Sequence, residues 1–544
     1  MRFELDINPA KASAWRAAGY WQDRLVSDQV DGWAGKAPER LCFIDSRGTI
    51  DYATLQSASY RLADAFLQRG VKPGEVVAAQ LPNWLEFAVL HVALVRIGCI
   101  TCLITPMSRE REVSAMLRTS QARWFFVPAT YRDFDYVGLA RQVRADQGLP
   151  LEIVVVGQPG SEEDGWNALM AAGFDSAAAR SAIDALRPGY DEPAEIVFTS
   201  GTTSEPKGAI HTHNTLLAPQ LAMARSLRLS EKTMLHMGST VAHQTGFLNG
   251  IRLPLQVGGT CVLQDKWSGD AFAELVERHR IEVSNGSSTF LLDFLRSDAV
   301  GKRDLSSLRI FRCGGGPIPI GLVREAEARL PGLKALRGWG QTENGVVTLT
   351  GLDDPVTVRA ETDGRVQPGM DIRVVDAGNQ VLPDGQEGRL QCRGAFQSPS
   401  YANSAELMKQ SSVDGWFDTG DLAVRDAQGC IRICGRSKDI IIRGGENIPV
   451  AYVENVLFED PRVLEAAVVG MPDPRLGERA CVFVICRPGQ SLDLDRMRKF
   501  LAERGVAAPY WPERLEIVDS FPRTANGKVR KAALRQLLSS GAAA

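Results

Sequence analysis

Short apolar runs alternate with longer amphipathic segments along the first 190 residues of the chain. The short runs predict buried strands, and the spacing of apolar residues every three or four positions predicts helices. Buried strands separated by helices are typical of parallel sheets that helices cover on both faces. This part of the chain therefore predicts an α/β fold, with a helix over 54–67, strands over 76–81, 124–127 and 153–156, and an apolar helix that begins after Asn83.

A polar stretch from Thr199 to Gly208 interrupts this alternation. Strand-like residues precede it at 194–198 and follow it at 209–212, and Asn214 is expected to cap the helix that comes next. Glycines let the backbone come close to a ligand, hydroxyls donate hydrogen bonds, and a lysine adds a positive charge. Such a loop can wrap a polyphosphate, although it lacks the Gly-Lys-Ser/Thr order of a Walker A loop. The predicted phosphate-binding residues are Thr199, Ser200, Gly201, Thr202, Thr203, Ser204 and Lys207.

Composition excludes several classes of partner. Lys and Arg number 62 and Asp and Glu 65, so a nucleic-acid surface or a polybasic membrane patch is not indicated.

A chain of 544 residues is too long for a single hydrophobic core, and about two to four domains or subdomains are expected. The most apolar window, 85–104, contains charged residues and predicts a buried helix and strand, not a membrane span.

Ten cysteines lie mostly singly in apolar surroundings. Cys99 and Cys102 form a CxxC pair, but no second Cys/His pair lies near it, so we expect no zinc. Free thiols indicate a reducing compartment, and the first residues lack the apolar core of a signal peptide. A cytoplasmic protein is therefore expected.

Five further motifs follow the polar stretch in order. A strand at 309–313 ends in three glycines, which leave flat backbone against which a ring can lie. The others are Gly338-Trp339-Gly340-Gln341-Thr342-Glu343, Trp416-Phe417-Asp418-Thr419-Gly420-Asp421-Leu422, Gly435-Arg436-Ser437-Lys438-Asp439 and Pro522-Arg523-Thr524-Ala525-Asn526-Gly527-Lys528. Together with the polar stretch, they resemble the signatures of the adenylate-forming (AMP-binding) superfamily, which holds acyl-CoA synthetases, peptide-synthetase adenylation domains and luciferases.

The resemblance implies a large N-terminal domain of layered α/β sheets with a small β subdomain, hinged to a small C-terminal α+β domain. The corresponding boundaries are 1–435, a hinge at 436–440 with Lys438 as the hinge residue, and 441–544. In the family the C-terminal domain rotates between two half-reactions. The same resemblance implies that Gly444 and Gly445 line the pantetheine tunnel of coenzyme A when that domain has turned.

The resemblance also implies roles in a nucleotide site. Adenine would lie against Gly314, Gly315 and Gly316 and stack on Trp339 beside Gly340, while Asp421 binds the ribose hydroxyls and Arg436 the ribose or phosphate. Thr342 would lie beside the α-phosphate and Glu343 would hold Mg²⁺, a hard cation that prefers oxygen ligands. Lys528 would be the catalytic lysine, presented by a tight Asn-Gly turn.

The implied acyl pocket is mainly apolar. Its candidates carry no lysine or arginine for a second carboxylate: they are His243, Phe247, Ser288, Phe290, Asn344 and Val346, with Gly314 and Gly316. A lone histidine such as His243 is as well explained by a structural role. Local details are similar to cyclohexanecarboxylate- and benzoate-type CoA ligases.

The implied enzyme is an AMP-forming acyl-CoA synthetase that uses ATP, Mg²⁺ and coenzyme A on a small carboxylic acid. One alternative is a free-standing aryl-acid enzyme that loads a carrier-protein phosphopantetheine. Another is a nucleotide-binding regulator without activity, against which the retained Lys528, Glu343 and Asp421 argue. The expected partners are the acid, ATP and CoA, with no nucleic acid and no membrane span, and a homodimer is compatible with the resemblance.

Overall fold

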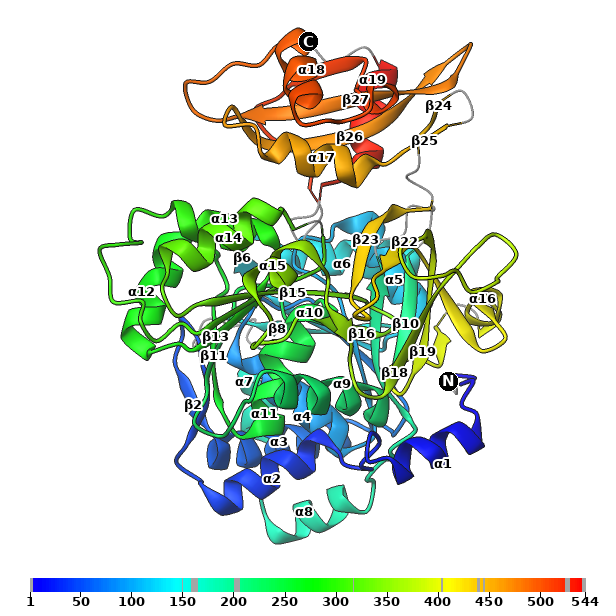
Figure 1. Ribbon diagram of the computed structural model, residues 1–544. Helices are drawn as coiled ribbons and strands as arrows, with labels where there is room; N and C mark the ends of the chain where they lie inside the picture. Colours follow the sequence, from blue (N-terminus) through cyan, green and yellow to red (C-terminus); the bar gives the residue numbers. More distant parts are fainter. Residues whose placement is uncertain are drawn as a thin grey trace.

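Four large sheets organise the chain, three of them before Lys438 and one after it (Figure 1). The computed structural model describes residues 3–148, 150–157, 165–199, 206–316, 318–402, 405–437, 441–443, 446–523 and 529–540. Within these ranges, none of the helices is both long and apolar enough to cross a bilayer.

The first sheet has seven strands in the order β20-β10-β9-β4-β3-β5-β8. Its five strands from β9 to β8 are parallel, as the apolar runs predict, whereas β10 and β20 are antiparallel additions at one edge. The bounds are β3 Val76–Ala79, β4 Ile100–Leu103, β5 Trp124–Pro128, β8 Glu152–Val156, β9 Pro193–Thr199, β10 Lys207–Thr212 and β20 Ser400–Tyr401. Thus β9 and β10 form a hairpin whose tip is the polar stretch, because Lys207 pairs with Thr199.

Helices of the N-terminal half cover this sheet. The long apolar α4 is buried on all sides, which explains why its sequence lacks a polar face. The bounds are α1 Pro9–Ala17, α2 Val26–Lys36, α3 Tyr52–Gln68, α4 Leu85–Arg96, α5 Glu110–Ser120, α6 Tyr136–Gln147, α7 Gly165–Ala172 and α8 Ala177–Asp184. A small antiparallel pair, β6 Thr130–Tyr131 and β7 Phe134–Asp135, precedes α6.

The second sheet has nine strands in the order β17-β16-β15-β14-β13-β11-β12-β1-β2. Six neighbouring strands from β15 to β1 are parallel, and β16, β17 and β2 are antiparallel edges. The bounds are β1 Leu41–Ile44, β2 Thr49–Asp51, β11 Met234–Met237, β12 Thr260–Leu263, β13 Val283–Gly286, β14 Ile310–Cys313, β15 Lys334–Gln341, β16 Gly345–Leu349 and β17 Arg365–Val366.

Helix α9 and the π-helix η1 join the two sheets. Helix α9 contacts β10 of the first sheet and β16 of the second, and η1 packs on α9, β11 and β12. The helices of this half are α9 His213–Ser226, α10 Gln244–Gly246, η1 Phe247–Arg252, α11 Leu253–Val257, α12 Gly269–His279, α13 Ser288–Arg296, α14 Ile320–Arg329 and α15 Val356–Glu361. One continuous core therefore lies between the sheets, with side chains from both.

The prediction that Asn214 caps α9 is wrong. Thr212 is the cap: its hydroxyl accepts a hydrogen bond from the Thr215 amide at 3.2 Å, so the helix begins at His213. The Asn214 amide instead donates to Asp23 at 2.7 Å and to Asp191 at 2.9 Å. Both residues are good caps, and long-range carboxylates decide between them.

Five antiparallel strands form the β subdomain, in the order β18-β19-β22-β21 with β23 beside β22. Strand β23 ends at Arg436, the first residue of the predicted hinge. The bounds are β18 Met370–Val375, β19 Glu387–Gly394, β21 Ser412–Val413, β22 Trp416–Arg425 and β23 Ile431–Arg436, with helix α16 Ala405–Gln410.

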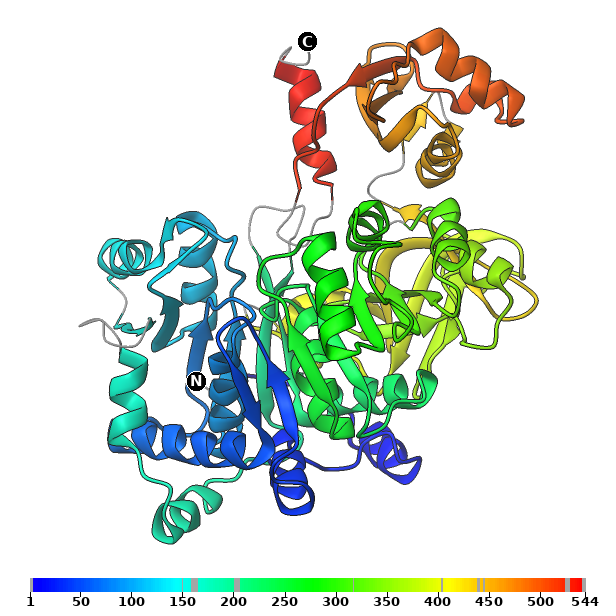
Figure 2. The same cartoon turned by 90° about the vertical axis from the view of Figure 1, so that its left-hand side faces the viewer.

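The last sheet belongs to a small lobe that stands apart from the large one in both views (Figures 1 and 2). Its long hairpin β26–β27 carries helices on its faces and has its own apolar core. The predicted combination of a large α/β domain, a β subdomain and a small C-terminal domain is confirmed. The bounds are β24 Ile441–Arg443, β25 Glu446–Ile448, α17 Val450–Phe458, β26 Val463–Asp473, β27 Gly477–Cys486, α18 Leu494–Glu503, η2 Ala508–Tyr510, β28 Arg514–Ile517 and α19 Lys531–Ser540.

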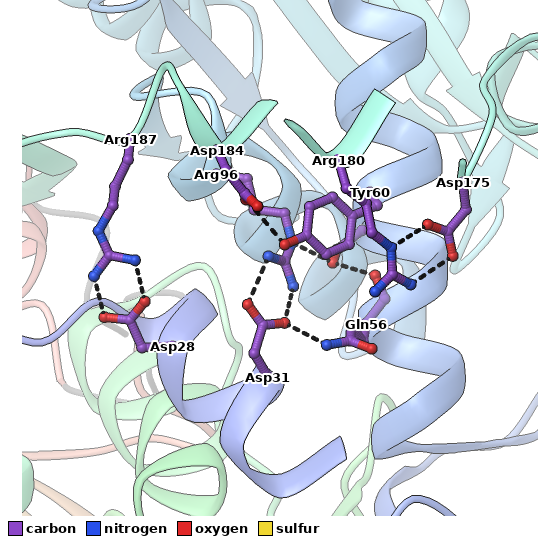
Figure 3. A network of polar contacts seen from close by, with 10 residues as sticks. Asp28, Asp31, Gln56, Tyr60, Arg96, Asp175, Arg180, Asp184 and Arg187 are labelled. Carbon is purple, nitrogen blue, oxygen red and sulfur yellow. Dashed lines mark hydrogen bonds and ion pairs between the residues drawn. The ribbon is translucent and has the colours of Figure 1, made fainter. Parts of the chain in front are cut away.

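A polar network fastens the helices of the N-terminal half to one another (Figure 3). The Arg96 guanidinium of α4 donates to Asp31 of α2 at 2.6 and 3.0 Å and lies 3.7 Å from the centroid of the Tyr60 ring of α3. The Tyr60 hydroxyl donates to Asp184 of α8 at 3.0 Å. Because only 2 % of the Arg96 side chain is exposed, its charge depends on these partners.

Candidate active site

The carboxyl ends of β14 and β15 lie side by side at one edge of the nine-stranded sheet, where ligands bind in open α/β sheets. Gly314 follows β14 directly, and a Cβ atom added to it would lie 3.2 Å from the Gly338 carbonyl oxygen. Gly315 has a positive φ of 85°. Cys313, just before this turn, is buried, and burial raises the pKa of its thiol to about 12. The glycine turn and the Gly338–Glu343 motif therefore lie side by side.

Trp339 and Asp421 are joined directly. The indole Nε1 donates to Asp421 Oδ2 at 2.8 Å, and Gln341 Nε2 donates to the same oxygen at 3.2 Å. Arg436 Nε donates to Asp421 Oδ1 at 3.1 Å across the β22–β23 pair. Three residues predicted to surround the nucleoside thus lie together around one carboxylate. The tryptophan, at 8 % exposure, is held by its polar edge.

Gly340 has an explanation that needs no ligand. A Cβ atom added to it would lie 1.8 Å from the Gly345 carbonyl oxygen, at the irregular step of the β15–β16 pair. No side chain fits there, so the close approach of the two strands requires glycine. The predicted contact between Gly340 and a cofactor stays a prediction.

Glu343 lies at the edge of the first sheet, reached through β20. Its Oε1 accepts a hydrogen bond from the Tyr401 hydroxyl at 2.7 Å, and its main-chain carbonyl accepts one from the Ser398 amide at 2.7 Å. The Lys207 ammonium lies 5.6 Å from the centroid of the Tyr401 ring. Lys207 and Glu343, two residues predicted to act on phosphate and metal, therefore meet around one aromatic ring.

Thr342 is held by His211, which lies on β10, the strand that also carries Lys207. The imidazole Nε2 donates to the Thr342 carbonyl at 2.8 Å, and Nδ1 lies 3.2 Å from the Thr215 hydroxyl. Burial lowers the pKa of His211 to about 4, opposed by its bond to that carbonyl, so the ring is neutral near pH 7. Since a carbonyl only accepts, the proton of the neutral ring resides on Nε2.

The predicted acyl-pocket residues occupy two different settings. His243, Ser288, Phe290 and Val346 are partly exposed, and the Phe290 ring stacks on Trp267 with 4.4 Å between centroids. Phe247 is fully buried in η1, where its ring meets His91 edge-on at 4.7 Å. The pocket roles of these four and of Phe247 stay predictions. Phe247 stands as a core residue in this arrangement.

Asn344 is fully buried, and neither amide atom finds a hydrogen-bond partner among the described residues. The adjoining Gly345 packs within 3.3 Å of Pro219 of α9 and near Leu248 of η1, counted from an added Cβ atom. Asn344 thus lies between α9 and the second sheet, where a buried polar group normally has a hydrogen-bond partner.

Comparison with known proteins decides the family. A family model described as AMP-binding enzyme matches residues 30–402, and one described as AMP-binding enzyme C-terminal domain matches residues 452–528. The chain belongs to the AMP-binding enzyme family. The predicted family membership is confirmed. The prediction of an AMP-forming acyl-CoA synthetase is confirmed as well.

Relatives of this AMP-binding enzyme match along almost its whole length. It is 35 % identical to the medium-chain fatty-acid–CoA ligase of Escherichia coli (strain K12), over 98 % of this chain and 94 % of the relative. It is 31 % identical to the salicyl-AMP ligase / salicyl-S-ArCP synthetase of Mycobacterium tuberculosis, over 97 % of this chain and 93 % of the relative. The ATP-bound structure of MatB from Rhodopseudomonas palustris superposes with a TM-score of 0.84 at 26 % identity, over 94 % of this chain and 98 % of that one.

Several predicted residues of the AMP-binding enzyme lie outside the described ranges. They are Ser200, Gly201, Thr202, Thr203, Ser204, Lys438, Gly444, Gly445 and Lys528. Their roles rest on the sequence motifs. Thr199 and Lys207, which flank the polar stretch, are described and pair with each other across the β9–β10 hairpin.

Sequence reasoning missed two residues of this site, Tyr401 and His211. Tyr401 lies in a segment of mixed character without a recognisable strand, and its two-residue strand forms only because β10 offers an open edge. His211 lies in an apolar strand, where alternation places it on the same face as its cross-strand neighbour Glu195. That alternation was the only signal in the sequence.

Glu195 and His211 face each other at the base of the hairpin and contact different segments, Gln244 and Thr342 respectively. With its amide oriented to satisfy both groups, Gln244 of α10 donates to the Glu195 carboxylate at 3.0 and 3.2 Å. Burial raises the pKa of Glu195 to about 8, opposed by the charge of Arg252 and by Gln244. The β9–β10 hairpin, which carries the polar stretch at its tip, is thus hydrogen-bonded both to α10 and to the Thr342 motif.

Proposed function

We propose that this enzyme joins a small carboxylic acid, cyclic or of short to medium chain length, to coenzyme A at the expense of ATP. The carboxylate oxygen attacks the α-phosphorus, the bond to pyrophosphate breaks, and an acyl-adenylate forms. The sulfur of CoA then attacks the acyl carbon, loses its proton, and displaces AMP. Neither half needs a nucleophile from the protein.

One observation supports this proposal above the others. Gln341 donates a hydrogen bond to Asp421. Glu343, two residues further along the chain, accepts a hydrogen bond from Tyr401, whose ring lies beside Lys207. Asp421 and Glu343 are therefore linked through neighbouring residues. A ribose at Asp421 would place its phosphates toward Glu343 and Lys207. Fixed charges and donors at this place stabilise the negative charge that gathers on the transferring phosphoryl group.

Magnesium fits the donors present. Within the described ranges no group of three or more His, Cys, Asp or Glu side chains could hold a metal by itself. A single carboxylate, Glu343, suits a cation that keeps several waters and takes its other ligands from phosphate. We propose that Glu343 holds the Mg²⁺ of MgATP, which would supply charge neutralisation at the phosphates when bound.

The acid is proposed from the relatives and from the residues together. The full-length relative from Escherichia coli (strain K12) is named for medium-chain fatty acids, and a solved neighbour is named a benzoate CoA ligase. The partly exposed candidates His243, Phe290 and Val346 include no lysine or arginine for a second carboxylate. A monocarboxylic acid with an uncharged tail therefore suits this pocket best.

The acceptor has a second candidate, a carrier-protein phosphopantetheine. The salicyl-AMP ligase / salicyl-S-ArCP synthetase relative supports it, at an identity only a few per cent lower than that of the CoA ligase. Both candidates need the second half-reaction. We propose that residues 436–440, with Lys438 as hinge, let the C-terminal part 441–544 turn between the halves, so that Lys438→Pro impairs overall turnover more than pyrophosphate exchange.

A panel of carboxylic acids tests the function. Cyclohexanecarboxylate, benzoate, salicylate and C4–C10 fatty acids are each incubated with MgATP, and pyrophosphate and AMP are measured with CoA, with a phosphopantetheinylated carrier protein, and with neither. We expect acid-dependent AMP formation that CoA accelerates. Acceleration by the carrier alone would favour the second candidate. Pyrophosphate release with none of the acids would revive a nucleotide-binding regulator.

A further inference from the structure

Tyr401 is a buried residue that the reaction scheme above does not use. It comes from β20, which joins the edge of the seven-stranded sheet beside β10, so that Tyr401 pairs with Ala209, two residues after Lys207. Only 4 % of the residue is exposed. Ser398 hydrogen-bonds the Ile210 carbonyl at 2.7 Å and thereby fixes the segment that leads into β20.

The Tyr401 hydroxyl acts on one oxygen of Glu343. It donates to Oε1 at 2.7 Å, whereas no described residue donates a hydrogen bond to Oε2. A carboxylate oxygen accepts and the phenol O–H donates, so the Tyr401 hydroxyl is the donor of this bond. A carboxylate with one oxygen bound in this way presents the other in a fixed direction, as the outer-shell partners of metal ligands do.

The ring of Tyr401 acts on Lys207. The ammonium lies 5.6 Å from the ring centroid, within the range of a cation–π contact. Among the described residues no ion pair joins Lys207 to Glu343, although both contact the same side chain. Tyr401 therefore holds an anion by its hydroxyl and a cation by its face, and keeps the two from neutralising each other.

We propose that Tyr401 is a positioning residue that orients Glu343 toward a divalent cation and keeps Lys207 available to a phosphate. The proposal rests on the function proposed above, because it takes Glu343 as the ligand of the magnesium of MgATP. It adds a residue of β20, at the edge of the seven-stranded sheet, to a site built from the two large sheets and the β subdomain. Tyr401 touches neither reacting atom and acts through Glu343 and Lys207.

Tyr401→Phe tests the hydroxyl alone, and Tyr136→Phe is its matched control. Tyr136 is also buried, and its hydroxyl donates to the Pro106 carbonyl at 2.8 Å and not to Glu343. For each variant, Mn²⁺ binding in the presence of ATP is measured by electron paramagnetic resonance. The Mg²⁺ concentration that gives half-maximal acid-dependent pyrophosphate exchange is measured in parallel.

We expect Tyr401→Phe to weaken Mn²⁺ binding and raise the half-maximal Mg²⁺ concentration by about 10-fold, the lower end of what loss of an outer-shell partner costs. At saturating Mg²⁺ its rate should approach that of the unmodified enzyme. Tyr136→Phe should change neither quantity. In a Glu343→Gln background, Tyr401→Phe should have no further effect on either.

Unchanged Mn²⁺ binding or an unchanged Mg²⁺ requirement in Tyr401→Phe would overturn the proposal. Melting temperatures guard against a loss of folding, and both variants are compared at a temperature where each is folded. The manganese measurement needs no turnover, so it tests Tyr401 even where no acid supports exchange. Absence of exchange by the unmodified enzyme would count against the proposed function and not against Tyr401.

Discussion

The Trp339 indole nitrogen donates a hydrogen bond to Asp421 Oδ2 at 2.8 Å, although 82 residues separate the two in sequence. The bond joins the second large sheet to the β subdomain. It also fixes the carboxylate that we propose for the ribose. Trp339 thus positions the Asp421 carboxylate, in addition to its proposed stacking on adenine.

Asp421→Asn should raise the KM for ATP about 10- to 100-fold, because an amide cannot accept from Trp339, Gln341 and a ribose at once. That change equals roughly 1.4–2.7 kcal/mol of binding free energy. Initial rates at varied ATP measure it. Asp371→Asn, at an exposed position of β18, is the control and should leave the KM unchanged. An equal KM in both variants would remove Asp421 from the nucleotide site.

Lys528→Ala should slow the first half-reaction by about 10²–10³, as loss of one donor to a developing charge does. Thioester formation from a supplied acyl-adenylate should stay near its normal rate, because the lysine is proposed to act only on the phosphate transfer. Pyrophosphate exchange and single-turnover thioester formation separate the two. Lys499→Ala in α18 serves as control. Equal losses in both halves would contradict the assigned role.

His236→Gln should make the free energy of unfolding decrease less steeply as the pH falls below 6.5. Burial lowers the pKa of His236 to about 3, opposed by its bond to Gln264, whereas an unfolded histidine has a pKa near 6.5. Between these values the unfolded chain binds one more proton, so the free energy of unfolding decreases as pH falls. From pH 6.5 to pH 5 this histidine accounts for roughly 1.5 kcal/mol.

Urea unfolding of the unmodified protein and of His236→Gln at both pH values checks this difference. His279→Gln, a partly exposed position at the end of α12, should alter the pH dependence less. The same slope in His236→Gln and in the unmodified protein would show that His236 takes up its proton without unfolding.

Asp31→Ala should destabilise the protein by about 3 kcal/mol, because it leaves the Arg96 charge, 2 % exposed, without its carboxylate. The estimate stays at the low end of the usual range because a third of the Asp31 side chain meets water. Asp353→Ala removes the partner of exposed Arg228 and should change stability by less than about 0.5 kcal/mol. Equal midpoints in urea would contradict the role of the network in Figure 3.

The sequence predicts this fold where the pattern is local. The apolar runs at 124–127 and 153–156 lie in parallel strands, and the predicted strand 76–81 forms over Val76–Ala79. It fails where distant groups choose between equal local options. Asn214 and Thr212 are both good caps, and only Asp23 and Asp191 draw the asparagine away.

The candidate site divides in the same way. Motif residues such as Trp339, Asp421 and Arg436 can be named from their neighbours in sequence, and the structure brings these three together. Tyr401 could not be named, because its role comes from pairing with a strand nearly two hundred residues earlier. Periodicity carries no information about such a pairing.

The buried cysteines have a chemical consequence for an enzyme that makes thioesters. Cys313 immediately precedes the glycine turn of the candidate site, and its thiol stays protonated far above neutral pH. A protonated, enclosed sulfur is a poor nucleophile. Under the function proposed above, Cys313 would therefore not compete with the incoming thiol for the acyl-adenylate.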